Sequence, residues 1–126
     1  MNLAVYFAAA EGAGILGTAD AAGNVDLAVY EPPEVVDVDT IALNMLNRRS
    51  YRNLQQNPRA AYMFIERSQK WSGWRLYLEK IGEIPGRERV AQLRAAGKPI
   101  TDPAQSSKFY VTFKVTGVRP LVGDSQ

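Results

Sequence analysis

Alternating apolar and polar side chains, with β-branched and aromatic residues at the apolar positions, recur along most of the chain. Alternation with this composition is typical of half-buried strands. Between the first two such segments the sequence DAAGN is rich in turn-forming residues, which predicts a hairpin. The pattern as a whole predicts six strands, at residues 14–20, 24–31, 40–46, 60–66, 74–84 and 108–121.

Helical patterns are fewer and shorter, and they predict helices at residues 3–14, 50–57 and 86–97. The first helix should end at Gly12 or Gly14, because glycine favours a C-terminal cap. Ser50 is expected to cap the second helix at its N-terminus, and Pro58 to stop it. These helices are too few to alternate regularly with the strands.

The segment EPPEVVDVD, residues 31–39, cannot be a central strand, because its two prolines remove donors from a strand ladder. We expect an irregular or edge connection there. Hairpin-spaced strands with few helices favour an antiparallel barrel or sandwich over a doubly wound parallel sheet. The glycines of EGAG precede a strand and do not follow one, which argues against a dinucleotide-binding motif. A length of 126 residues predicts a single domain over residues 1–126.

Histidine and cysteine are both absent from the sequence. Their absence argues against a structural zinc site, a haem held by histidine, and Cys-His or Ser-His-Asp catalysis. We therefore expect no metal site, and an enzyme with this composition would borrow a cofactor for its chemistry. No apolar run is long enough to cross a bilayer, and no cationic segment precedes an apolar one at the N-terminus, so we expect a cytoplasmic protein without a membrane partner.

The charges are unevenly distributed, since residues 1–47 hold seven acids and no Lys or Arg. Residues 44–65 hold four arginines and no carboxylate. Arg48, Arg49 and Ser50 stand where a strand gives way to a helix, and guanidinium groups, a hydroxyl and helix N–H groups together suit a phosphate monoester. The alternative is that Ser50 only caps the helix while the arginines are solvated or paired with acids. A nucleic-acid partner is unlikely, because no recognisable motif is present and the net charge is only +2.

Four segments in this order resemble the FMN-binding split-barrel family related to pyridoxamine 5′-phosphate oxidase. They are GILGTADAAGNVDLAVYE, TIALNML, NRRSYRNLQQNPRAAYMFI and WRLYLEKIGEI, within residues 10–84, and RRSYRNLQQNPRAA is the most specific part. The resemblance implies a mainly β fold, namely a six-stranded antiparallel split β-barrel with small peripheral helices. It also implies FMN as the cofactor and a homodimer with the flavin between the subunits.

Carried over by position, the resemblance implies nine cofactor-binding residues. Three would hold the phosphate, three would lay strand backbone along the ring, two would end the third strand beside it, and one would bring positive charge to it: Arg48, Arg49 and Ser50; Ala28, Val29 and Tyr30; Asn44 and Met45; and Arg75. The true oxidases bind their substrate through an Arg and His pair, which a chain without histidine lacks, so pyridoxamine phosphate oxidation is not expected.

The function expected from the resemblance is that of an FMN-binding flavoprotein, an oxidoreductase that transfers hydride or electrons to or from an unidentified small molecule. No residue qualifies from the sequence as a dedicated acid or base, although Tyr30 and Glu31 stand near the expected flavin. Two alternatives remain open. One is a non-catalytic flavin-binding or electron-carrier protein, and the other is a split-barrel module that binds haem, a deazaflavin or no cofactor.

Overall fold

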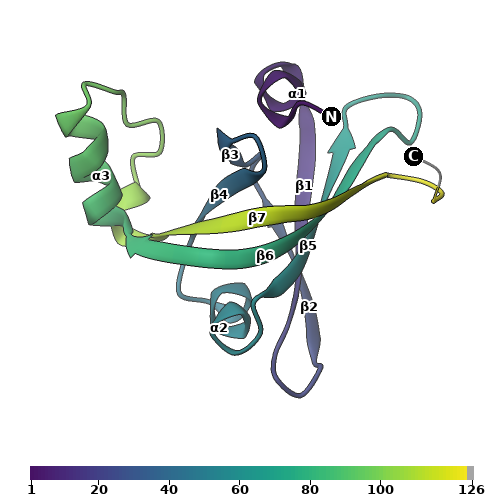
Figure 1. Ribbon diagram of the computed structural model, residues 1–126, viewed down its shortest axis with the longest axis horizontal. Coiled ribbons are helices and arrows are strands. Elements are labelled where there is room, and N and C mark those ends of the chain that lie inside the picture. The colour runs from purple at the N-terminus through teal and green to yellow at the C-terminus, as the bar shows by residue number, and fades with distance from the viewer. Residues whose placement is uncertain (125–126) are drawn as a thin grey trace.

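The computed structural model describes residues 1–124, which form one antiparallel seven-stranded sheet with three α-helices (Figure 1). In chain order the elements are α1 (Leu3–Ala9), β1 (Gly12–Ala19), β2 (Val25–Tyr30), β3 (Glu34–Asp37), β4 (Thr40–Met45), α2 (Arg49–Gln56), β5 (Arg59–Glu66), β6 (Gly73–Pro85), α3 (Gly86–Ala95), a 3₁₀ turn (Gln105–Ser107) and β7 (Phe109–Pro120). The strands lie in the order β2-β1-β5-β6-β7-β4-β3. No helix in residues 1–124 has the length and apolar character needed to cross a membrane.

The expected class, mainly β and antiparallel with small helices, is confirmed, but the expected number of six strands is wrong. The additional strand is β3, which follows Pro32 and Pro33 and pairs with β4 alone. An edge strand needs a partner on one side only, so prolines at its entry cost no ladder hydrogen bond. Among the described residues the sheet is open, with β2 and β3 as its two edges.

The first helix ends earlier than the sequence predicts. α1 begins after Asn2, whose side chain accepts a hydrogen bond from Val5 N–H at 3.0 Å, and it closes at Ala10. Gly12 and Gly14 lie in β1 and do not cap the helix. A Cβ atom at Gly14 would stand 1.9 Å from the hydroxyl oxygen of Tyr62, so this glycine is required by close packing and not by a helix end.

The core lies on one face of the sheet and takes side chains from five strands, from α2 and, through Leu3, from α1. Its fully buried members include Leu16, Ile41, Met45, Tyr62, Phe64, Leu76, Val111 and Phe113. Leu54 ties α2 to this core at 3% exposure, and Asn53 of the same helix donates a buried hydrogen bond to Thr18 of β1 at 3.1 Å. The start of α2 is therefore held in a fixed position between β4 and the β1–β2 hairpin.

Candidate functional site

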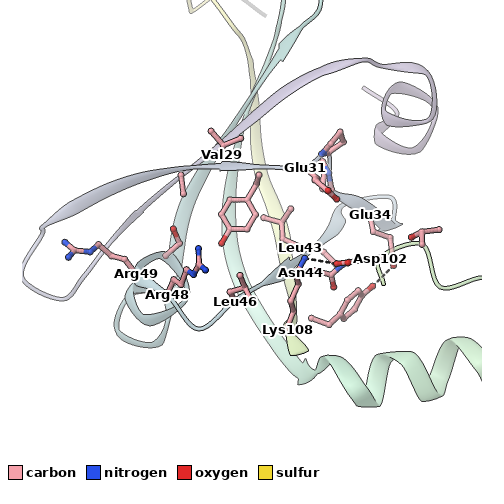
Figure 2. Close-up of a pocket in the computed structure, with 18 of the residues that line it drawn as sticks. Val29, Glu31, Glu34, Leu43, Asn44, Leu46, Arg48, Arg49, Asp102 and Lys108 are labelled. Atoms are coloured by element: carbon pink, nitrogen blue, oxygen red, sulfur yellow. Dashed lines mark hydrogen bonds and ion pairs between the residues drawn. The ribbon is translucent and has the colours of Figure 1, made fainter. Parts of the chain in front are cut away.

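A cavity of about 700 Å³ lies where the end of β2, the end of β4 and the start of α2 approach one another (Figure 2). The segment that leads into β7 closes another side through Thr101, Asp102 and Lys108. Apolar walls separate two polar ends and consist of Ala28, Val29, Pro32, Pro33, Leu43 and Leu46. The cavity thus combines apolar walls with many polar groups, and polar groups at defined places are what orient a ligand in a small-molecule site.

The start of α2 forms a cationic end of this cavity. Arg48 is the N-cap residue, and its side chain makes no capping hydrogen bond. Neither Arg48 nor Arg49 forms an ion pair or a side-chain hydrogen bond within residues 1–124. In Figure 2 the head group of Arg48 points toward the cavity, whereas that of Arg49 points away from it. Because the first N–H groups of a helix have no intrahelical acceptor, this end offers both backbone donors and a guanidinium group to an anion.

Ser50 and Tyr30 meet at the same cationic end. Ser50 lies within α2 and is only 4% exposed, so the prediction that it caps the helix is wrong; Arg48 occupies that position with an extended backbone. The Tyr30 hydroxyl lies near the Ser50 side chain. Burial raises the pKa of Tyr30, although the nearby Ser50 hydroxyl and the charge of Arg48 act in the opposite direction. Tyr30 is consequently a neutral hydroxyl at ordinary pH.

The opposite end of the cavity carries an ion pair close to the end of β4. Lys108 Nζ donates to Asp102 Oδ2 at 2.8 Å, and this hydrogen bond holds the pKa of Asp102 below its usual value. Asn44, which also lines the cavity, accepts a hydrogen bond on Oδ1 from Gln105 Nε2 at 3.1 Å. This end therefore contains donors as well as a neutralised carboxylate.

A second carboxylate at this end is also paired. Tyr110 donates its hydroxyl hydrogen bond to Glu34, and Arg89 forms an ion pair with the same carboxylate at 2.9 Å. The Arg89 guanidinium lies 4.5 Å from the centre of the Tyr110 ring. Burial and the Glu34 carboxylate both raise the pKa of Tyr110, so its hydroxyl remains protonated.

Of the nine residues that the sequence indicated, seven line the cavity: Ala28, Val29, Tyr30, Asn44, Arg48, Arg49 and Ser50. Two do not. Met45 is fully buried in the core. Arg75 binds the C-terminal segment, with Nε donating to the Pro120 carbonyl at 2.8 Å and an Nη atom 3.6 Å from Asp124. Within one chain, the cation at the end opposite Arg48 is thus Lys108 and not Arg75.

Sequence reasoning missed the residues that the last third of the chain contributes, namely Asp102, Gln105, Lys108 and Tyr110. Residues 98–107 carry no periodic pattern, so nothing in their spacing indicated a site. They reach Asn44 because β7 pairs with β4 in a register that sets Tyr110 opposite Asn44. The only signal was the strand prediction for residues 108–121, which does not specify a partner strand.

No family model and no curated protein matches the chain. Among solved structures, an FMN-binding protein from Syntrophomonas wolfei subsp. wolfei superposes with a TM-score of 0.74 at 21% identity, over 93% of this chain and 82% of that one. A putative pyridoxamine 5′-phosphate oxidase from Lactobacillus delbrueckii gives 0.67 at 15% identity, over 86% and 84%. An F420 reductase gives 0.64 at 16% identity, over 85% and 88%.

These similarities establish the fold as that of the FMN-binding, pyridoxamine 5′-phosphate oxidase-like proteins, in agreement with the resemblance seen in the sequence. They cover most of the chain, between 85% and 93% of it. Identities of 21% and below do not carry over a ligand or an activity, so the argument for function depends on the cavity itself.

Proposed function

We propose that this chain is a flavoprotein that binds FMN in the cavity beside α2 and takes part in hydride or electron transfer with a small molecule. The observation that supports this proposal is the cationic end, where the uncapped N-terminus of an eight-residue helix, the unpaired Arg48 and the Ser50 hydroxyl converge. The donor chemistry there fits a phosphate monoester, and the apolar walls fit an aromatic ring system.

Each residue at the cationic end has a defined task in this proposal. Arg48 and the N–H groups at the start of α2 bind the phosphate oxygens, and Ser50 adds a hydroxyl donor. Tyr30 lies beside Ser50 and adds a second neutral hydroxyl at this end. When bound, FMN supplies the capacity to accept and release hydride or electrons. Ala28 and Val29 of β2 and Leu43 of β4 bound the space for its ring and restrict access of water.

FMN is chosen over a larger flavin because the donors gather around one point of the cavity and so match a single terminal phosphate. Two of the neighbours support a flavin in general terms, since one is an FMN-binding protein and another an F420 reductase. Titration with FAD alongside FMN is therefore part of the test, and FAD should bind no more tightly.

A non-catalytic flavin carrier is the second candidate. The observation in its favour is that two carboxylates of the lining are already engaged: Glu34 with Arg89 and Tyr110, and Asp102 with Lys108. A general base has to be free to take a proton. Reduction of the FMN complex by NADH or NADPH, followed by reoxidation with a second substrate, distinguishes the enzyme from the carrier.

The phosphate assignment is tested by titrating the protein with FMN and with riboflavin, which lacks the phosphate. We expect FMN to bind at least about tenfold more tightly, because a charge-assisted hydrogen bond contributes roughly 1.5–3 kcal/mol. Arg48→Ala should remove most of this difference. Arg52→Ala, on the same helix but outside the cavity lining, should leave it unchanged. Equal binding of riboflavin and FMN by the wild type would refute the proposal.

We also propose that the chain forms a homodimer through the outer face of β2. Val25, Leu27 and Val29 project from the same face of this edge strand and are 82%, 74% and 81% exposed. A contiguous apolar stripe on an exposed edge is typical of an interaction surface. Val29 also lines the cavity, so a second copy that covered the stripe would border the proposed flavin site.

A further inference from the structure

We propose that the end of the cavity opposite Arg48 is a hydrogen-bond-donor subsite, formed by the Asn44 amide and oriented by Gln105, that takes a carbonyl or anionic oxygen of the ligand. This inference rests on the proposed function, since the flavin is the ligand in its test. Gln105 is a positioning residue in this arrangement, because it acts through Asn44.

Gln105 is held rigidly enough to orient a neighbour. Its side chain is buried, at 4% exposure, in the 3₁₀ turn before β7. Its backbone N–H donates to the Asp102 carbonyl at 3.1 Å, and its carbonyl accepts from Lys108 N–H at 3.0 Å. A Cβ atom at Gly86 would stand 1.8 Å from that same carbonyl, so the start of α3 packs directly against the turn. The turn therefore has no room to shift.

The orientation of the Asn44 amide is consequently fixed, with its oxygen toward Gln105. Its Oδ1 accepts the hydrogen bond from Gln105 Nε2 at 3.1 Å. A carboxamide has one oxygen acceptor and one NH₂ donor, so this bond turns the nitrogen of Asn44 to the other side. Asn44 lines the cavity. Its Nδ2 donates no hydrogen bond within residues 1–124 and is not fully buried, because the one fully buried side-chain polar atom without a partner there is Nε of Arg89.

Lys108 adds a second donor beside Asn44. Figure 2 shows Asn44, Lys108 and Asp102 together at the end of the cavity away from Arg48 and Arg49. One of the three ammonium hydrogens of Lys108 is engaged by Asp102 at 2.8 Å, which leaves hydrogens for a ligand. Because the ion pair is locally neutral, the subsite attracts an acceptor mainly through directed hydrogen bonds and not through net charge.

A donor subsite of this kind has a measurable electronic consequence. Hydrogen bonds to an acceptor become stronger when the acceptor carries negative charge. With FMN as the ligand, the Asn44 amide therefore stabilises the reduced flavin more than the oxidised flavin and raises its midpoint potential. The two polar ends also fix the direction of the ligand, with its phosphate at Arg48 and its acceptor end at Asn44.

The test compares flavin affinity and midpoint potential in two variants. Asn44→Ala removes the donor, so it should weaken FMN and riboflavin by the same factor, about two- to tenfold for one hydrogen bond, and shift the potential to a more negative value. Gln105→Glu offers only acceptors, so the Asn44 nitrogen should turn toward it and present Oδ1 to the cavity. We expect Gln105→Glu to weaken flavin binding and to lower the midpoint potential at least as much as Asn44→Ala does.

A double-mutant cycle separates orientation from the added charge. Gln105→Glu should have a much smaller effect in the Asn44→Ala background than in the wild type. Ser106→Glu places a carboxylate at an exposed position of the same turn and should change neither the flavin affinity nor the midpoint potential. An unchanged ratio of FMN to riboflavin affinity shows that the phosphate end and the fold are intact.

The outcomes distinguish the subsite from the proposed function. If the wild type binds FMN and Asn44→Ala leaves both affinities and the potential unchanged, the subsite is wrong while FMN binding stands. Equal effects of Gln105→Glu in both backgrounds refute the positioning role. Binding of neither flavin by the wild type overturns both proposals. Asn44→Ala alone keeps the test decisive if Gln105→Glu does not fold.

Discussion

Tyr62 links the core to the wall of the cavity through a single hydroxyl group. Its ring is fully buried, and the hydroxyl donates to the Glu31 carbonyl at 3.0 Å. Glu31 directly follows β2 and lines the cavity. The ring fits only because Gly14 lies above the hydroxyl in β1. Gly14 and Tyr62 thus fix the backbone at Glu31, and with it the end of β2 at Ala28–Tyr30, which lines the cavity.

Gly14→Ala should therefore destabilise the protein. The new methyl group would stand 1.9 Å from the Tyr62 hydroxyl and 2.7 Å from the Tyr30 carbonyl, so both must move. We expect a loss of about 1–3 kcal/mol in the free energy of unfolding, as for other overpacked sites, measured by urea denaturation. Gly17→Ala in the same strand is the control, because its methyl group would meet a flexible Leu27 methyl group at 3.3 Å and the Ala61 carbonyl oxygen at an ordinary contact distance of 3.7 Å. Equal losses in the two variants would contradict this explanation.

At the residue scale, the sequence indicated the parts of the site that are local in the chain. Arg48, Arg49 and Ser50 are adjacent, and a strand running into a helix suggested their chemistry before any coordinates. Gln105 and Asn44 are 61 positions apart, and their hydrogen bond depends on the β4–β7 pairing, which no local pattern encodes. Met45 was indicated because it adjoins Asn44, but strand alternation turns it into the core.

At the element scale, α2 is clamped to the sheet by a polar cluster around Glu83 of β6. The Tyr51 ring stacks on Phe109 with 4.4 Å between ring centres, and its hydroxyl donates to Glu83 at 2.5 Å. Lys80 pairs with the same carboxylate at 2.5 Å, and Gln55 donates to it at 3.0 Å. The cluster ties the helix that begins at Arg48 to two strands of the sheet, so the cationic end keeps its position relative to the far end.

The Glu83 cluster makes the stability of the protein depend on pH in the acidic range. Burial alone would raise the pKa of Glu83, but hydrogen bonds from Lys80, Tyr51 and Gln55 outweigh it and hold the pKa below the usual 4.5. A carboxyl group with a lowered folded-state pKa contributes stability that is present above its unfolded pKa and lost as the pH falls through the folded one. Its contribution is therefore complete at pH 7 and declines below about pH 4.5.

Glu83→Gln should lower the free energy of unfolding at pH 7 by about 1–3 kcal/mol, because Lys80 loses its partner and the hydrogen bonds lose their charge. It should also flatten the decline in stability between about pH 5 and pH 3. Urea denaturation at several pH values measures both effects. Glu79→Gln, in the same strand but without a side-chain hydrogen bond or ion pair in residues 1–124, is the control. An acid dependence identical to that of the wild type would rule out the clamp.

The elements themselves were largely predictable. Alternation identified β1 and β4 to β7 to within a few residues, because each buries one face against the core, and it identified β2 although the alternating apolar face of that strand is exposed. β3 has only four residues and pairs on one side, so its pattern was too short to separate from a loop. α1 was extended too far because Gly12 and Gly14 are typical of a helix end. Their role in tight strand packing depends on β5, about fifty positions away, through the Ile65 backbone for Gly12 and the Tyr62 side chain for Gly14.

At the scale of the whole molecule, the cavity lies where the acidic N-terminal part of the chain meets the basic remainder. Asp26, Glu31 and Glu34 come from the part without Lys or Arg, while Arg48 and Lys108 come from the other part. The uneven charge seen in the sequence therefore does not form two separate surfaces. Charged groups of both signs line the cavity, where Arg48 is unpaired and most of the acids at the far end are neutralised.

The last prediction concerns β2, an exposed edge strand of the sheet. Leu27 is 74% exposed at the centre of the stripe Val25–Val29, and such an edge is stable in water when another surface covers it. In a two-fold dimer one charge is introduced twice into an apolar contact, so Leu27→Asp should convert a dimer into a monomer. Light scattering on a sizing column measures the change in molar mass. The monomer should also bind FMN more weakly, because no second subunit covers Val29.

The control is Val38→Asp, which should leave the dimer intact because Val38 is an 86% exposed valine in the β3–β4 turn, away from β2. A wild type that is monomeric at tens of micromolar, or a Leu27→Asp variant that stays dimeric, would show that the stripe is not the contact between subunits.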